Sequence, residues 1–152
     1  MKVIISPDSF KGTMSSVEAA ASIEKAIKQI SETIETVCLP VADGGEGTLD
    51  ALVAATNGRF VETTVSNPIG REIRARYGVL GDEKTCVIEM AEASGITLLS
   101  KEERNPMKAT TFGTGQLIDH ALCQGYRHFI IGIGGSATND AGLGMLHALG
   151  LK

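Results

Sequence analysis

A glycine-rich loop over residues 132–140 carries the largest group of side chains that could do chemistry together. It joins an apolar run to a predicted helix, so backbone N–H groups and the helix start could bind a phosphate or a sugar. The candidate binding residues are Gly134, Gly135, Ser136, Thr138 and Asn139, and Asp140 could bind Mg²⁺ or accept a proton. A tight turn capped by the Asn-Asp pair is the alternative, and the residues alone leave both interpretations open.

A second glycine-rich loop, with Asp43, Gly44, Gly45 and Glu46, again lies between an apolar run and a helix. Two carboxylates in such a turn are costly unless they are solvated, cap the helix or bind a ligand. The loop is therefore either a helix start, with Glu46 complementing the helix dipole, or a site for substrate or Mg²⁺.

The loop after the first apolar run contains Asp8, Ser9 and Lys11. Ligands in open α/β sheets bind beyond the carboxyl ends of the strands, where this loop is expected to lie. Lys11 is a candidate to neutralise a phosphate and Asp8 is a candidate base. An ordinary polar connection would explain the same residues.

Two weaker candidates lie further along the chain. Glu89 is surrounded by apolar residues and is either a partnered structural group or a functional carboxylate, and Glu92 follows it closely. Residues 110–115 offer hydroxyl and amide groups, either to an anion or for capping of a helix by Thr111 or Thr114.

Known nucleotide-binding motifs constrain the loop at residues 132–140. It lacks the G-x-x-x-x-G-K-[ST] pattern of a Walker loop. Gly132, Gly134 and Ala137 match the loose dinucleotide fingerprint G-x-G-x-x-G/A. A nucleotide-sugar-binding or NAD-binding protein therefore stays open, and titration with a nicotinamide cofactor would test it.

The elements that must position these loops alternate between strand and helix up to residue 58. Residues 2–6 and 36–41 predict strands, each followed by a helix. The first helix begins at a capping box of Ser15 and Glu18, and the second ends near Gly58. This β-α-β-α order predicts a parallel sheet, whose carboxyl ends would bring the candidate loops to one edge.

After residue 58, apolar and polar residues alternate with a period of two. Residues 59–66, 72–79 and 85–91 predict a three-stranded antiparallel meander with one wet face, which includes Arg76. The remaining chain predicts an irregular segment, a helix near Gly113, a strand over residues 127–133 and a final helix. The fold class is therefore α/β, with a parallel portion and an antiparallel meander.

Composition excludes several classes of protein. The chain has 152 residues, 43% hydrophobic, with a net charge of −4, so neither disorder nor nucleic-acid binding is expected. No apolar run approaches the ~18 residues of a membrane span. The cysteines are three in number and far apart, and the histidines lack ligand spacing, which indicates reduced thiols in a cytoplasmic protein.

Five segments together resemble the glycerate kinase family. They are SPDSFKGTMSSVEAA (6–20), LPVADGGEGT (39–48), IEMAEASG (88–95), RNPMKATTFGTGQLI (104–118) and IIGIGGSATNDAGLGML (130–146). They follow the family's order and spacing over nearly all of the chain. The resemblance implies a bacterial kinase that uses ATP and Mg²⁺ to phosphorylate D-glycerate, generally to 2-phosphoglycerate.

The resemblance also suggests roles for the candidate residues. Lys11 would be an electrostatic stabiliser, and Asp8 or Asp140 a base or metal ligand. Ser9 and the two glycine-rich loops would bind the substrate and its phosphate.

The family's architecture implies a Rossmann-like domain with a mixed α/β domain inserted in it. We expect residues 1–65 to belong to the first and residues 66–152 to the second. Because family members are about twice as long or more, the chain is expected to be an N-terminal part of one. A non-catalytic ligand-binding or assembly fragment without a complete cleft is the alternative function, and exposed sheet edges could support a homo-oligomer.

Two positions depart from the family's pattern. Asn67 and Ala141 stand where the family often has glycine. The first is expected to alter only a turn. The second adds a methyl group beside the predicted anion-binding loop.

Overall fold

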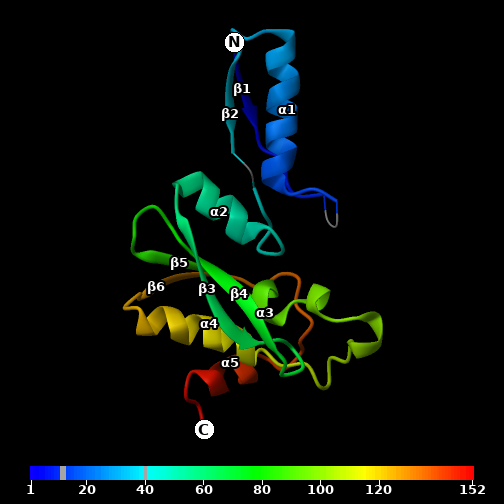
Figure 1. Cartoon of the computed structure of the whole chain (residues 1–152), viewed down its shortest axis with the longest axis vertical. Coiled ribbons are helices and arrows are strands. Elements are labelled where there is room, and N and C mark those ends of the chain that lie inside the picture. Colours follow the sequence, from blue (N-terminus) through cyan, green and yellow to red (C-terminus); the bar gives the residue numbers. More distant parts are fainter. Residues whose placement is uncertain (11–12, 40) are drawn as a thin grey trace.

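The computed structural model describes residues 1–10, 13–39 and 41–152. The predicted catalytic residue Lys11 lies outside these residues. Figure 1 shows a narrow N-terminal unit, made of β1, α1 and β2, next to a wider unit that contains the C-terminus. The described residues contain no helix that is both long and apolar enough to cross a membrane.

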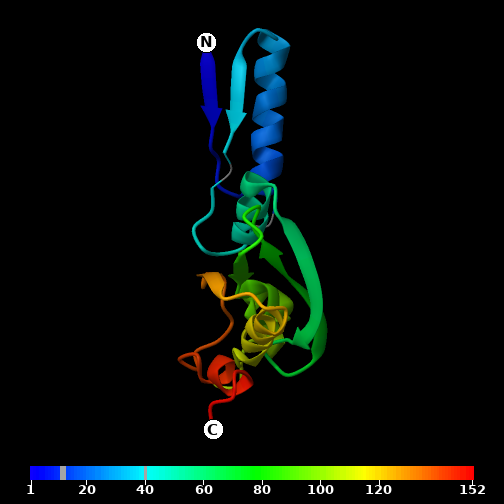
Figure 2. The ribbon, with the colours of Figure 1, turned by 90° about the vertical axis from the view of Figure 1, so that its left-hand side faces the viewer.

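The N-terminal unit is a parallel pair of strands with one helix beside it (Figure 2). β1 (Lys2–Ile5) pairs with β2 (Glu35–Cys38), and α1 (Ser16–Ile30) connects them. The predicted capping box at the start of α1 is confirmed. The Glu18 backbone N–H donates to Ser15 Oγ at 3.2 Å, and the Ser15 N–H donates to the Glu18 carboxylate at 2.9 Å.

The wider unit contains a four-stranded sheet in the order β3-β4-β5-β6. Its strands are β3 (Arg59–Ser66), β4 (Glu72–Val79), β5 (Thr85–Glu89) and β6 (His128–Gly132). β3, β4 and β5 form the predicted antiparallel meander, and β6 pairs with β5 in parallel. The fold is thus mixed α/β, as predicted. The parallel strands differ from expectation in one respect, because they belong to two separate sheets.

Helices cover both faces of the four-stranded sheet. α4 (Phe112–Cys123) packs on one face, where Tyr77, Ile88 and Leu117 form the largest core. α2 (Thr48–Thr56) packs on the other face, where Leu49, Val53 and Val87 form a second core. The prediction of a wet face on β4 is therefore wrong near the end of the strand, where α2 covers it.

Short elements complete the wider unit. α3 (Ala91–Ser94) follows β5, two 3₁₀ turns cover Ile96–Leu98 and Lys101–Glu103, and α5 (Leu143–Ala148) packs against α4. β5 and β6 run parallel, so their carboxyl ends lie side by side. Glu89 and Gly132 are the last residues of these strands and are paired in register.

Candidate functional site

The two glycine-rich loops contact each other through their backbones. The Gly134 N–H donates to the Gly44 carbonyl at 2.8 Å. A Cβ on Gly134 would lie 2.5 Å from the Cα of Gly45, and one on Gly132 would lie 2.7 Å from the Gly44 carbonyl oxygen. The predicted convergence of these loops is therefore real, although the loops come from different sheets. Close backbone packing is sufficient reason for glycine at both positions.

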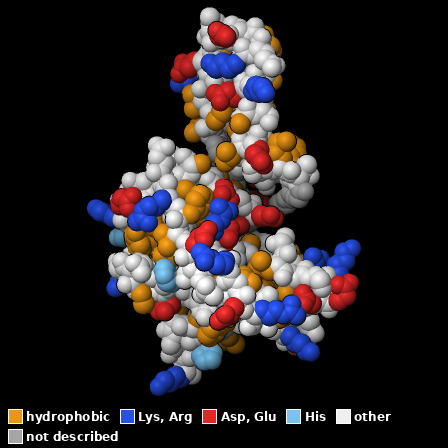
Figure 3. Space-filling model, in the orientation of Figure 1, with side chains coloured by type: hydrophobic (Ala, Val, Ile, Leu, Met, Phe, Trp, Pro, Cys, Tyr) orange, Lys and Arg blue, Asp and Glu red, His pale blue; other side chains and the backbone are white. Residues whose placement is uncertain are grey.

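A cleft of about 350 Å³ lies between the N-terminal unit and the four-stranded sheet. Its walls include the loop after β1, the starts of α1 and α2, and the ends of β4 and β5. Acidic and basic side chains gather at the junction of the two units (Figure 3). Among the described residues, the charged side chains that line the cleft are Glu18, Glu46, Asp50, Arg76, Glu89 and Glu92.

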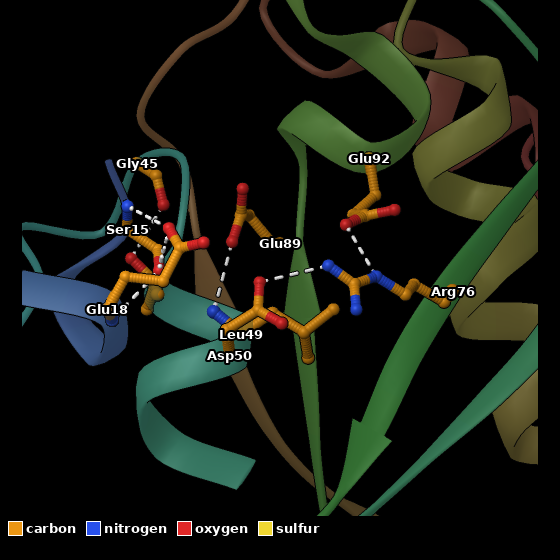
Figure 4. Close-up of polar contacts among 9 residues, drawn as sticks. Ser15, Glu18, Gly45, Leu49, Asp50, Arg76, Glu89 and Glu92 are labelled. Atoms are coloured by element: carbon orange, nitrogen blue, oxygen red, sulfur yellow. Dashed lines mark hydrogen bonds and ion pairs between the residues drawn. The ribbon is translucent and has the colours of Figure 1, made fainter. Parts of the chain in front are cut away.

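Arg76 holds two of these carboxylates. Its guanidinium bonds to Asp50 on α2 at 2.9 Å and to Glu92 on α3 at 3.0 Å (Figure 4). The guanidinium carbon also lies 4.6 Å from the centre of the Phe60 ring. Burial lowers the pKa of Arg76, but the two carboxylates outweigh that effect and raise it. The arrangement fixes α2 and α3 to β4 and neutralises part of the negative charge in the cleft.

Glu89 is the most buried carboxylate in the cleft. Its side chain ends β5 at 3% exposure, and Oε2 accepts a hydrogen bond from the Leu49 N–H at 3.0 Å. Burial raises its pKa to about 7, and the charges of Glu92 and Asp50 add to this rise. Hydrogen bonds from the backbone of Leu49 and Gly47 oppose it. Near neutral pH the group therefore exchanges a proton readily.

Replacing Glu89 with glutamine is expected to stabilise the protein at pH 8 by up to about 3 kcal/mol. The folded carboxyl keeps its proton up to about pH 7, whereas its ordinary pKa is 4.5. Raising the pH from 4.5 to 7 therefore favours the unfolded wild-type chain, and the amide has no such dependence. Urea denaturation of both proteins at pH 4.5 and pH 8 measures the effect. Equal stability of the two at pH 8 would contradict it.

Of the described residues in the loop after β1, Ser9 is the predicted one that lines the cleft. Its backbone N–H donates to Asp8 Oδ1 at 2.6 Å, so Asp8 shapes the turn that presents Ser9. From the second loop, Glu46 lines the cleft. Asp43 accepts a hydrogen bond from the Gly45 N–H at 3.0 Å and organises the turn before α2.

Asp140 lies outside the lining of the cleft and joins the start of α4 to the start of α5. Its carboxylate accepts hydrogen bonds from the backbone N–H groups of Thr111, Gly142 and Gly144 at 2.8–3.1 Å. The Thr111 hydroxyl also donates to it, at 2.9 Å from one oxygen and 3.1 Å from the other. Burial raises the pKa of Asp140, but these hydrogen bonds outweigh burial and lower it. Such a saturated carboxylate is suited to structural support.

The rest of the loop at residues 132–140 is also held by local contacts. The hydroxyls of Ser136 and Thr138 lie 2.7 Å apart, and the Gly135 carbonyl accepts from the Ile96 N–H at 2.9 Å. Asn139 is exposed. These residues do not line the cleft described above.

Comparison with known proteins decides the family. The model of the glycerate kinase family matches residues 3–152. The chain belongs to the glycerate kinase family. Over 150 residues it is 55% identical to a glycerate kinase from Bacillus subtilis (strain 168), with 99% of this chain and 39% of that protein covered. Over 152 residues it is 50% identical to a glycerate 2-kinase from Escherichia coli (strain K12), with 100% of this chain and 40% of that protein covered.

A related crystal structure has the same fold. It is that of a candidate glycerate kinase 2 from Salmonella typhimurium LT2, with a TM-score of 0.86 and 50% identity. The match covers 99% of this chain and 40% of that one. The chain thus spans about 40% of the length of the glycerate kinases it matches.

The structure shows what Asn67 and Ala141 do at the two positions where the resemblance implies glycine. The Asn67 carboxamide oxygen accepts from the N–H groups of Ile69 and Arg71, at 3.0 and 2.9 Å, so it builds the turn between β3 and β4. Ala141 has a φ of 52°, a left-handed conformation in which a side chain costs roughly 1 kcal/mol. Glycine suits that position because of the backbone conformation.

Three charged cleft residues, Glu18, Asp50 and Arg76, were missing from the site set predicted from sequence. The alternation in β4 places Arg76 on the polar face but does not say that α2 covers that face. The sequence indicates Glu89 and Glu92 only weakly as site residues. Glu89 is a carboxylate within an apolar strand, and Glu92 follows that strand. The position of Glu89 near the end of a predicted strand is a signal that favours a functional carboxylate, because ligands bind where parallel strands end.

Proposed function

We propose that a protein of family length carrying this segment transfers the γ-phosphoryl group of ATP to D-glycerate and forms 2-phosphoglycerate. The observation that carries the proposal is the convergence of strand-end loops on one cleft, in a chain 50–55% identical to proteins named glycerate kinase. Phosphoryl transfer depends chiefly on positioning and on charge stabilisation, and such a cleft suits both.

Mg²⁺ and ATP fit the chemistry of the cleft. Carboxylate and hydroxyl oxygens are the donors that Mg²⁺ prefers, and it commonly takes one or two carboxylates together with substrate phosphates. Within residues 1–10, 13–39 and 41–152, no group of three His, Cys, Asp or Glu side chains could hold a metal alone. We propose Asp8 as the candidate ligand, since its Oδ1 accepts a bond from the Ser9 N–H, whereas both oxygens of Asp140 accept several bonds. Bound Mg²⁺ would neutralise charge on the phosphates.

The roles of the other predicted residues follow from this proposal. Ser9 and Glu46 would contact the substrate, and Lys11 would neutralise phosphate charge. Gly44 and Gly45 would act chiefly by packing against Gly134. The division into a Rossmann-like and a mixed α/β domain stays a proposal, and its predicted boundary between residues 65 and 66 falls within β3. A cytoplasmic location and a homo-oligomer through sheet edges also stay predictions.

The proposal is tested by measuring ADP formation from Mg-ATP and D-glycerate with the family-length protein. Turnover with D-glycerate, weaker turnover with L-glycerate, and NMR identification of 2-phosphoglycerate are the expected results. No turnover with D-glycerate would contradict the proposal. The same assay on the 152-residue chain addresses the alternative of a non-catalytic fragment, which turnover above background would exclude.

Replacing Lys11 with alanine in the family-length protein is expected to lower kcat/KM for D-glycerate by roughly 10²-fold. Loss of one charge contact to a phosphoryl group in the transition state typically has an effect of this size. Lys84 lies exposed in the hairpin between β4 and β5, and Lys84→Ala is the matched control. A change within about threefold for Lys11→Ala would show that Lys11 does not contact the phosphate.

A further inference from the structure

We propose that Glu89 accepts the proton of the glycerate hydroxyl when that hydroxyl is phosphorylated. This inference rests on the proposed kinase function and assigns a catalytic residue within it. It starts from the position of Glu89 as the last residue of β5, which pairs in parallel with β6. Its side chain faces the same cleft as Ser9 and Glu46.

The other carboxylates of the cleft are less suited to this role. Glu18 is bonded to both the backbone N–H and the hydroxyl of Ser15, at 2.9 and 2.8 Å, and these bonds lower its pKa. Asp50 and Glu92 are paired with Arg76. The Arg76 guanidinium therefore already occupies an oxygen of each of these two carboxylates.

Glu46 differs from Glu89 in its exposure. Its side chain is solvent-exposed, whereas Glu89 is almost fully buried. Burial removes the water that stabilises the charged form of a carboxylate, and this makes the buried Glu89 a stronger base.

Glu89 is held by backbone N–H groups at the start of α2, those of Leu49 and Gly47. The Leu49 N–H donates to Oε2, and Figure 4 shows the other oxygen pointing away from Leu49. A base held in place by backbone groups can accept a proton from a hydroxyl within hydrogen-bond reach.

Several elements contribute charged side chains to the cleft that Glu89 lines. Among the described residues, the charged side chains that line the cleft with Glu89 are Glu18 at the start of α1, Glu46 before α2, Asp50 on α2, Arg76 on β4 and Glu92 on α3. The negative charges of Glu92 and Asp50, together with burial, bring its pKa to about 7. A base with a pKa near the working pH is both available and strong enough to accept a proton.

The step balances as follows. The glycerate hydroxyl oxygen forms a bond to the γ-phosphorus of ATP, while its proton moves to the carboxylate of Glu89. The bond from that phosphorus to the β,γ-bridging oxygen breaks, and ADP leaves with the electron pair. Glu89 then returns the proton to water as the product leaves.

The test compares wild type, Glu89→Gln and Glu89→Asp in the family-length protein, over pH 5.5 to about 9 with D-glycerate and Mg-ATP. Glutamine keeps an oxygen for the Leu49 N–H but cannot accept the proton. We expect kcat of the glutamine variant to fall at least about tenfold, with KM for glycerate changed less than about threefold. Wild-type kcat/KM, which reports the groups of the free enzyme, should rise with an apparent pKa near 7, and this rise should be absent in the glutamine variant. Aspartate should restore the pH dependence and part of the rate.

The matched control is Glu62→Gln, whose exposed carboxylate pairs with Arg74 on the sheet away from the cleft lining. An active wild type with an unchanged rate or pH profile in Glu89→Gln would overturn the role of Glu89 alone. Far-UV circular dichroism shows whether each variant is folded, and failure of the glutamine variant to fold would place Glu89 in structural support and overturn the proposal. A wild type without turnover of D-glycerate would overturn the proposed function and this inference with it.

Discussion

Replacing Asp140 with alanine is expected to lower the free energy of unfolding by about 4 kcal/mol. The carboxylate accepts hydrogen bonds from three backbone N–H groups and from the Thr111 hydroxyl, at the junction of α4 and α5. Hydrogen bonds to a charged group each contribute roughly 1.5–3 kcal/mol, and donors left unpaired in a half-buried junction add to the cost. Urea denaturation followed by circular dichroism measures the change.

Two control variants show whether the loss of stability comes from the hydrogen bonds of the Asp140 carboxylate. Asp119 is exposed on α4, and Asp119→Ala should change stability by less than about 0.5 kcal/mol. Asp140→Asn keeps one acceptor oxygen and should lie between alanine and wild type. If Asp140→Ala were as stable as Asp119→Ala but enzymatically inactive, the original prediction of a catalytic Asp140 would be correct and the structural role wrong.

Replacing Gly113 with alanine is expected to destabilise the protein by about 3 kcal/mol. Gly113 lies in the first turn of α4, where the helix meets the end of β3. An added Cβ would lie 1.8 Å from the Ser66 carbonyl oxygen and 3.3 Å from the Ala93 Cβ. The helix must move off the strand to admit it, which breaks packing over the largest core.

The direction of the stability change in Gly113→Ala distinguishes a steric clash from helix propensity. Helix propensity alone predicts that alanine stabilises a helical position by roughly 0.5–1 kcal/mol relative to glycine. Gly125 has a φ of 95° with open space around it, so Gly125→Ala tests backbone strain without a clash and should cost about 1 kcal/mol. A Gly113→Ala protein with a higher melting temperature than wild type would contradict the close approach.

Local chemistry accounts for the parts of the fold that the sequence predicts correctly. The capping box at Ser15 and Glu18 depends on residues three apart, and the strands of the meander depend on a period of two. One boundary is slightly different. Asn57, with a φ of 52°, takes the left-handed position at the end of α2, next to the predicted Gly58.

The candidate site is harder to predict because its contacts are between distant residues. Arg76 meets Asp50 and Glu92 only because α2 and α3 pack against the same strand. Asp140 looks like a free acid in the sequence, but Thr111 and its neighbours occupy its oxygens. The glycines of α4 resemble an anion-binding loop in the sequence, whereas Gly113 allows close packing of α4 against β3.

The order of the strands in the four-stranded sheet has a consequence for how the chain folds. β3, β4 and β5 follow one another through short turns, so their hairpins can form early from local contacts. β6 joins β5 only after residues 90–127 have closed a long crossover. Until then the edge of β5 over residues 85–89 lacks its strand partner, and another chain can pair with it. Docking of β6 is therefore the step at which correct folding and aggregation compete.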